Sequence, residues 1–234
     1  MLRRVQMTLG DSVRDLLLGA SCVGCARPGR VLCPSCAATL PRGGRVCWPT
    51  PTPPGLVVPM AAGDYDGLLR RMVLAHKEHR VLALATPLGE VLAAVVADLV
   101  GAGTGPVALV PVPSRGPVVR ERGHDPMLRV ARQAARRLRA RGTRAAVRRL
   151  LVPCASVRDQ AGLDAGARAS NLAGTMSCRR RAAGSLPPGT LLVLVDDVLT
   201  TGSTAREGQR ALEAERLVLQ GIACVAATRR RFVR

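Results

Sequence analysis

The stretch that most constrains the fold is an apolar run, Leu191 to Val195, that contains no polar residue. A strand with one face in water alternates polar and apolar residues, whereas a strand covered on both faces does not. Strands of the second kind occur mainly in parallel sheets with helices on either side. The run therefore predicts an α/β domain with a mostly parallel, twisted sheet flanked by helices.

The amino-acid composition agrees with this fold class. Of the 234 residues, 47% are hydrophobic, but the chain has only one Trp, one Tyr and one Phe. A core built from Val, Leu and Ala suits helix-on-sheet packing better than an aromatic-rich β-sandwich. Further strands are expected at 107–113, 216–219 and 222–227, and helices within 64–79, 87–99, 127–141 and 205–215.

Two carboxylates, Asp196 and Asp197, directly follow the apolar run, and the turn Thr-Thr-Gly-Ser-Thr at 200–204 follows them. In open parallel sheets, ligands bind beyond the carboxyl ends of the strands. Backbone N–H groups and hydroxyls at a helix start cradle phosphate. Carboxylates repel phosphate but bond sugar hydroxyls or bind Mg²⁺. The stretch predicts a site for a phosphorylated sugar, and a simple acidic helix cap is the plainer alternative.

A cluster of cysteines near the N-terminus has the spacing of a zinc site. Two Cys-x-x-Cys pairs lie close together and supply the candidate ligands Cys22, Cys25, Cys33 and Cys36. Four thiolates bind Zn²⁺ tetrahedrally, and each tight turn places two sulfurs on the same side of the metal. Disulfides and redox thiols are the alternatives. The remaining cysteines are interpreted as small buried apolar residues: Cys47, Cys154, Cys178 and Cys224.

A proline-rich segment, residues 49–59, divides the chain into two predicted parts. Residues 1–48 would form an N-terminal helix and the zinc knuckle, and residues 60–234 the main domain. The N-terminal apolar stretch is interrupted by charged residues at positions 11, 14 and 15, and no uninterrupted apolar run reaches about 18 residues. We therefore expect a cytoplasmic protein without a membrane span.

The net charge of +19 comes almost entirely from arginine, because Lys77 is the only lysine. Coding bias and an anionic partner are both open explanations. The helix predicted at 127–141 carries four arginines opposite its apolar face: Arg129, Arg132, Arg136 and Arg139. This face is either solvated surface or a track for single-stranded nucleic acid. His76 and His79 are expected to lie exposed on another helix.

The apolar strand, Asp-Asp and Thr-Thr-Gly-Ser-Thr together resemble the phosphoribosyl pyrophosphate (PRPP) site of type I phosphoribosyltransferases. More of the chain resembles the ComF family, which is related to the GntX-type proteins. The matching features occur in order: the four-cysteine knuckle, Tyr65-Asp-Gly-Leu-Leu-Arg followed by Lys77, Val110-Pro-Val-Pro113, Arg120-Glu-Arg-Gly-His124, and Gln160, Leu163 and Arg168-Ala-Ser-Asn171-Leu172.

The resemblance implies roles for individual residues. Asp196 and Asp197 would bind the ribose hydroxyls, with Mg²⁺, and stabilise an oxocarbenium-like state. The PRPP-binding loop would consist of Val198, Thr200, Thr201, Gly202, Ser203 and Thr204. The pyrophosphate would be held by Ser114, Arg115, Arg120 and Arg122, because cations favour the charge that develops on a leaving pyrophosphate.

The resemblance also implies a function. A ComF-type protein would bind PRPP and act in natural competence, handling internalised single-stranded DNA together with DNA-uptake proteins. Two alternatives stay open: a metabolic phosphoribosyltransferase that transfers ribose 5-phosphate to a base and releases pyrophosphate, and a non-catalytic sensor of PRPP or nucleotides. The scarcity of aromatic residues counts mildly against both base salvage and binding of single strands by stacking.

Overall fold

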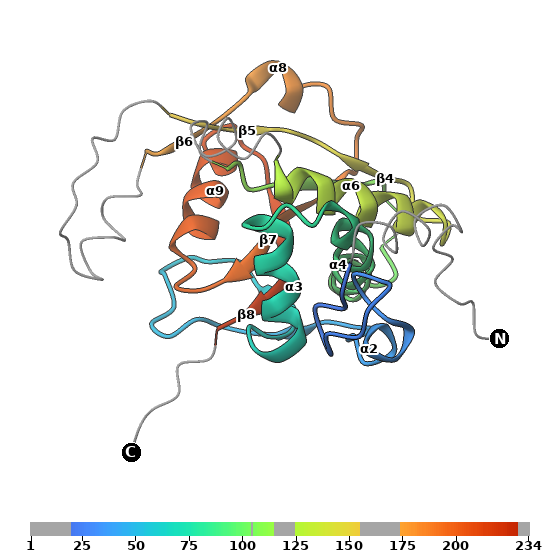
Figure 1. Ribbon diagram of the computed structural model, residues 1–234. Coiled ribbons are helices and arrows are strands. Elements are labelled where there is room, and N and C mark those ends of the chain that lie inside the picture. The colour runs from blue at the N-terminus through green and yellow to red at the C-terminus, as the bar shows by residue number, and fades with distance from the viewer. Residues whose placement is uncertain (1–19, 104, 115–124, 155–173, 229–234) are drawn as a thin grey trace.

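A six-stranded sheet forms the centre of the protein in a computed structural model that describes residues 20–103, 105–114, 125–154 and 174–228 (Figure 1). Its strands, in spatial order, are β1 (Arg45–Val46), β2 (Pro59–Asp64), β8 (Leu219–Ala227), β7 (Leu191–Leu199), β3 (Val107–Pro111) and β4 (Ala145–Val147). All neighbouring strands are parallel except β1, which is antiparallel to β2. The predicted α/β class with a mostly parallel sheet is confirmed.

Helices cover both faces of the sheet. One face packs against α4 (Ala85–Val100), which follows a 3₁₀ turn at Leu82–Leu84, and against α6 (Pro126–Arg139). The other face packs against α9 (Ser203–Glu213). Next to α9 lies a separate antiparallel pair, β5 (Leu151–Pro153) and β6 (Met176–Cys178), which is followed by the short helix α8 (Arg180–Ala183). Helix α3 (Gly67–Lys77) follows β2, and α2 (Pro34–Ala38) belongs to the cysteine segment.

The central strands are buried on both faces, as the uninterrupted apolar run predicts. Val193 and Val195 of β7 face the layer of α4 and α6, whereas Leu192 and Leu194 belong to the cluster on the α9 side. Each of these four side chains is at most 4% exposed. Two apolar layers on opposite sides of one sheet therefore form the core, and Val, Leu and Ala fill it.

One described segment, Leu82–Val100, is long and apolar enough to cross a membrane by composition alone. Over half of it is buried inside the protein, and α4 packs against α6, β8 and β2. These contacts identify it as a core helix of the α/β domain.

Several strands differ from those expected. The two stretches expected at 216–219 and 222–227 are one strand, β8, which begins at Leu219 after a turn at Arg216. Strand β2 was not predicted, since Pro-Met-Ala-Ala-Gly-Asp lacks the β-branched and aromatic residues that favour strands. Its pairing with β8 forms it nonetheless. Tertiary pairing overrides weak local propensity here.

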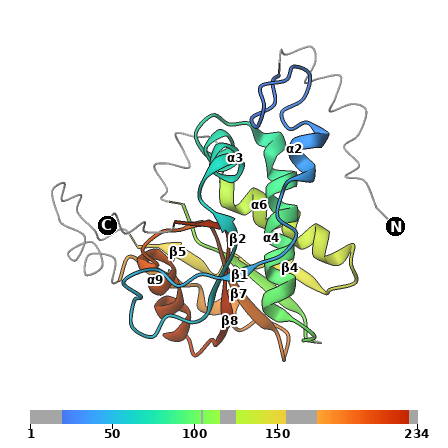
Figure 2. The same ribbon diagram turned by 90° about the horizontal axis from the view of Figure 1, so that it is seen from below.

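The N-terminal cysteine segment and the proline-rich segment both contact the main domain. Cys22, Leu32 and Cys33 share one buried cluster with residues of α3 and α4, and Figure 2 shows α2 beside α3 and far from α9. In the proline-rich segment, the Val57 N–H donates to Gln209 Oε1 (3.0 Å), and Gln209 Nε2 donates to the Gly55 carbonyl (2.8 Å). The expected division at 49–59 is untested by these contacts and stays a prediction.

Candidate functional site

The carboxylate pair lies where β7 extends beyond its neighbour β3. The last register pair of these strands is Pro111 with Val195, and the Val112 N–H still donates to the Val195 carbonyl (3.0 Å). Pro113 has no N–H to donate, so pairing on that side ends. On the other side, β7 pairs with β8 as far as Leu199. Asp196 and Asp197 thus lie within β7 rather than after it, but still at the carboxyl edge of the sheet.

Lys77, from the last turn of α3, contacts this pair. Its Nζ lies 2.8 Å from Asp197 Oδ2, and the Asp197 side chain is only 19% exposed. The Asp197 N–H donates to Asp196 Oδ1 (2.8 Å). Two carboxyl groups and one ammonium are therefore grouped on β7 and α3. Lys77 was not among the expected site residues, and its being the only lysine is the sequence signal that could have identified it.

The environment of Asp196 favours its neutral form. Burial of its carboxyl, and then the negative charge of Asp197, raise the pKa of Asp196 to about 8, although Lys77 and the Asp197 N–H oppose the shift. Paired carboxyl groups with a raised pKa are frequent at ligand sites, because a cation or hydroxyl donors from a ligand can relieve their repulsion. The pair has the donor set of hard oxygens that suits Mg²⁺.

The Thr200–Thr204 turn leads into α9 as expected. Gly202 is the residue before the helix and has a left-handed φ of +75°. The Thr201 hydroxyl donates to Ser203 Oγ (3.0 Å), and the Ser203 N–H donates to Thr201 Oγ1 (3.4 Å). The Arg206 N–H bonds to the Gly202 carbonyl, so the preceding amides lie at the open end of the helix, where anions bind.

The proline-rich segment packs against the back of this turn. A Cβ on Gly202 would lie 2.9 Å from Pro49 Cγ and 3.3 Å from Leu56 Cδ2, and Pro49 and Leu56 are themselves buried. Arg206 Nε also donates to the Pro54 carbonyl (3.0 Å). Only glycine combines the left-handed conformation with this close approach.

The other expected PRPP residues are only partly described. Ser114 is half-buried three residues after the end of β3, and Val198 packs against the core on the α4 side. Arg115, Arg120 and Arg122 lie outside the described residues, as does the stretch from Gln160 to Leu172. The structure therefore brings together Asp196, Asp197 and the 200–204 turn, and adds Lys77.

His76 corrects one expectation, since it is 2% exposed rather than on the surface. Its ring nitrogens lie 3.2 Å from the Val81 carbonyl and 3.3 Å from the Pro126 carbonyl. The histidine is buried because α3 packs against the start of α6, which the helical pattern alone does not reveal. His79 is exposed as expected and lies two residues after the end of α3.

The four N-terminal cysteines form the compact cluster that the sequence predicts. All four sulfurs lie within 4.8 Å of one another, and Cys25 Sγ is 3.6 Å from Cys33 Sγ. Tetrahedral zinc with Zn–S bonds of about 2.3 Å requires sulfurs about 3.8 Å apart. A Cβ on Gly24 would lie 2.6 Å from Cys36 Sγ, so this glycine leaves room for the cluster. The four cysteines could hold a metal ion such as zinc.

Backbone amides at the cluster favour thiolates. The Cys33 and Gly24 N–H groups donate to Cys22 Sγ at 3.3 and 3.4 Å. Burial opposes ionisation of Cys22, but these bonds outweigh it and lower its pKa to about 6. The pKa of Cys36 is raised to about 12, chiefly by its interaction with Cys33. Four thiolates cannot ionise together without a cation, and a bound metal would supply that charge.

Of the other cysteines, only Cys224 is fully buried as expected. Cys47, Cys154 and Cys178 are half-buried. Each of these three lies at a margin of the fold: beside β1, after β5 and at the end of β6. Sequence position did not distinguish the core cysteine from those at the margin.

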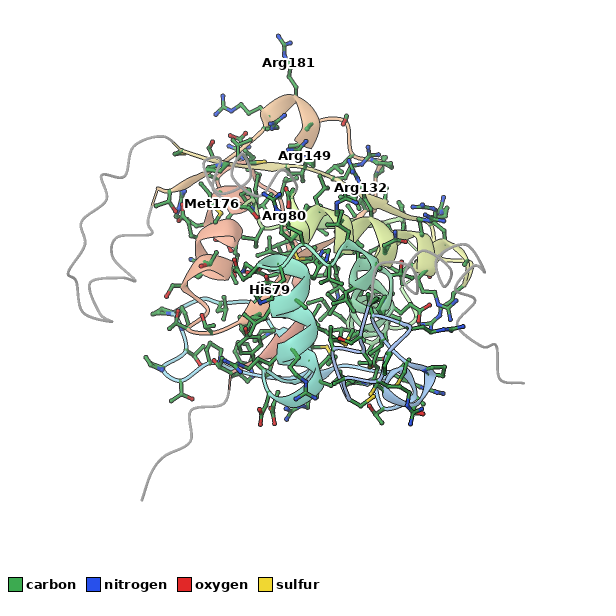
Figure 3. All side chains as sticks on the ribbon, viewed as in Figure 1. His79, Arg80, Arg132, Arg149, Met176 and Arg181 are labelled. Atoms are coloured by element: carbon green, nitrogen blue, oxygen red, sulfur yellow. The ribbon has the colours of Figure 1, made fainter. Side chains whose placement is uncertain are left out.

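The arginines of α6 lie on its exposed face as predicted, namely Arg129, Arg132, Arg136 and Arg139. Figure 3 shows Arg132 and Arg149 at the surface.

A hollow of about 310 Å³ is lined by Arg139, Arg144 and Arg148 together with the first residues of β3 and β4. It lies at the amino ends of these strands, opposite the carboxylate pair, and Arg139 Nη1 donates there to the Ala145 carbonyl (2.8 Å).

No protein-family model matches the chain, and no curated protein sequence matches it.

Proposed function

We propose that the protein binds PRPP at the carboxyl end of β7, with a fold like that of the type I phosphoribosyltransferases and a ComF-type role. One observation carries the proposal: the Asp196–Asp197 pair and the left-handed Gly202 turn follow each other at the carboxyl end of a buried parallel strand. Ligands of open α/β sheets bind at this edge. The pair offers acceptors for ribose hydroxyls, and the start of α9 offers donors for a phosphate.

The two halves of the site suit the two halves of the ligand. The amides and hydroxyls at 200–204 would hold the 5′-phosphate, and the carboxylates would accept hydrogen bonds from the vicinal ribose hydroxyls. Mg²⁺, when bound with PRPP, would offset part of the pyrophosphate charge. Ser114, which lies three residues after β3, would hold the pyrophosphate together with Arg115, Arg120 and Arg122.

If the protein is a transferase, the bond between ribose C1 and the pyrophosphate oxygen breaks, and an acceptor nucleophile attacks C1. The negative charge of the carboxylates would stabilise the positive charge that develops on the ribose. The acceptor nucleophile stays unassigned, and a metabolic phosphoribosyltransferase and a non-catalytic sensor of PRPP are the alternatives to the ComF-type role.

Titration calorimetry with Mg²⁺ and PRPP tests the proposal. The variant Asp196→Asn/Asp197→Asn is expected to lose measurable binding while its circular dichroism stays that of the wild type. A control, Glu90→Gln/Asp98→Asn, removes the same charge from α4 and should bind as the wild type does. Wild-type protein that fails to bind, or a double variant with unchanged affinity, would contradict the proposed function.

We further propose that single-stranded DNA is a partner and that the exposed arginines of α6 contact its phosphates. In the part of the main domain that is described, Tyr65 is the one aromatic residue, and it packs against the core. On this arginine face, affinity would come chiefly from phosphate contacts and would be sensitive to salt.

A further inference from the structure

Lys77 stands out in both the sequence and the structure. It is the single lysine among 35 basic residues, and its ammonium contacts the carboxylate pair of the candidate site. Arginine presents a large planar fork, whereas lysine presents a compact point charge on a flexible chain. In a chain that uses arginine everywhere else, a lysine at this one place indicates a requirement that arginine does not meet.

The space around Lys77 is narrow on the side of Asp197 and open on the other side. Lys77 and Asp197 line a recess of only about 10 Å³, whose other walls include His76, Pro126 and Met127. That volume is about the size of one water molecule. The ammonium lies beside Asp197 and leaves room for about one water molecule there. The Lys77 side chain is still 37% exposed, so its charged end can reach a ligand on the open side.

Helices α3 and α9 lie on different sides of β7. The turn at 200–204 leads into α9, whose apolar residues belong to one face of the sheet, whereas α3 packs with the cluster on the other face. Figure 2 shows α3 and α9 well apart around the end of the sheet. A ligand that spans this end of the sheet from the start of α9 would reach the side of α3, where Lys77 contacts Asp197.

We propose that Lys77 is a ligand-contacting residue, which pairs with Asp197 in the free protein and pairs with an oxygen of the pyrophosphate in the loaded protein. This inference rests on the proposed function. In the free protein Lys77 offsets the charge of the pair. In the loaded protein Asp196 and Asp197 would accept hydrogen bonds from the ribose hydroxyls, and Mg²⁺ bound there would supply positive charge. The Lys77 ammonium is then able to pair with the pyrophosphate. Because of this added contact, the protein binds PRPP more tightly than a sugar that carries only the 5′-phosphate.

The test compares two probes, PRPP and ribose 5-phosphate, each titrated with Mg²⁺. Lys77→Gln is expected to weaken PRPP binding by about tenfold or more, as loss of a charge-assisted hydrogen bond does, and ribose 5-phosphate binding by less than about threefold. Arg70→Gln removes the same charge from an exposed position of the same helix and should leave both affinities unchanged.

Lys77→Arg is a second variant in case Lys77→Gln does not fold. It keeps the charge but not the compact shape, and it too should lose preference for PRPP over ribose 5-phosphate. An unchanged ratio of the two affinities in a folded variant would overturn the inference and leave Lys77 as a structural ion pair. Wild-type protein that binds neither probe would overturn the proposed function itself, so the two failures are distinguishable.

Discussion

Replacing Gly202 with alanine tests whether the proline-rich segment packs on the Thr200–Thr204 turn. The backbone φ of +75° at this position is unfavourable for any residue with a Cβ, at about 1–2 kcal/mol. The new methyl group would also lie 2.9 Å from Pro49 Cγ, and overpacking of this kind costs about 1–3 kcal/mol more. We expect Gly202→Ala to lower the free energy of unfolding by about 2–5 kcal/mol.

Gly142→Ala provides the matched control. Gly142 also has a positive φ, of +89°, but no atom lies within 4 Å of the position its Cβ would take. Only the backbone cost of about 1–2 kcal/mol applies there. Urea unfolding of both variants, followed by far-UV circular dichroism, gives the difference. The fluorescence of Trp48, the single tryptophan, reports separately on the adjoining proline-rich segment. Equal destabilisation by the two substitutions would refute the packing of Pro49 on the turn.

Three further predictions concern the metal, pH and salt. The protein should contain one Zn²⁺ per chain by elemental analysis, and Cys33→Ser/Cys36→Ser should lose it together with stability; zinc retained in that variant would exclude the four-cysteine site. Because the pKa of Asp196 is about 8, binding of PRPP to the ionised pair should release a proton. The affinity for PRPP should therefore rise from about pH 6 to pH 8, by up to tenfold per pH unit. Asp196→Asn should remove this pH dependence. Replacing Arg129, Arg132, Arg136 and Arg139 with alanine should flatten the salt dependence of single-stranded DNA affinity by roughly 3 in logarithmic slope; equal slopes would leave this face as solvated surface.

The sequence predicted the parts of the fold whose signal is local. The uninterrupted run at 191–195 gave a strand buried on both faces, and the segregated arginines gave the exposed face of α6. The cysteine spacing likewise placed four sulfurs together. Each of these depends on a short periodic or spacing pattern, which the chain itself contains.

What the sequence could not predict depends on contacts between distant segments. The pairing of β2 with β8 forms a strand from residues of weak β propensity. The burial of His76 follows from the packing of α3 against Pro126, which is 50 positions away in the chain. The contact of Lys77 with Asp197 spans 120 positions. No local sequence pattern encodes contacts between such distant residues. The candidate site was therefore predicted as a strand end and a turn, without the ammonium of Lys77.

The position of β8 has a consequence for biosynthesis. This strand follows every other strand of the sheet in the sequence, yet it lies between β2 and β7 near the centre. While the ribosome is still making residues 219–227, β2 and β7 have no partner between them, and the contacts that join them span most of the chain. Closing such long loops is slow and entropically costly. The central sheet can therefore close only when β8 has left the ribosome. A nascent chain stalled before that point exposes two apolar strand edges, so it should be a preferred substrate of chaperones and proteases.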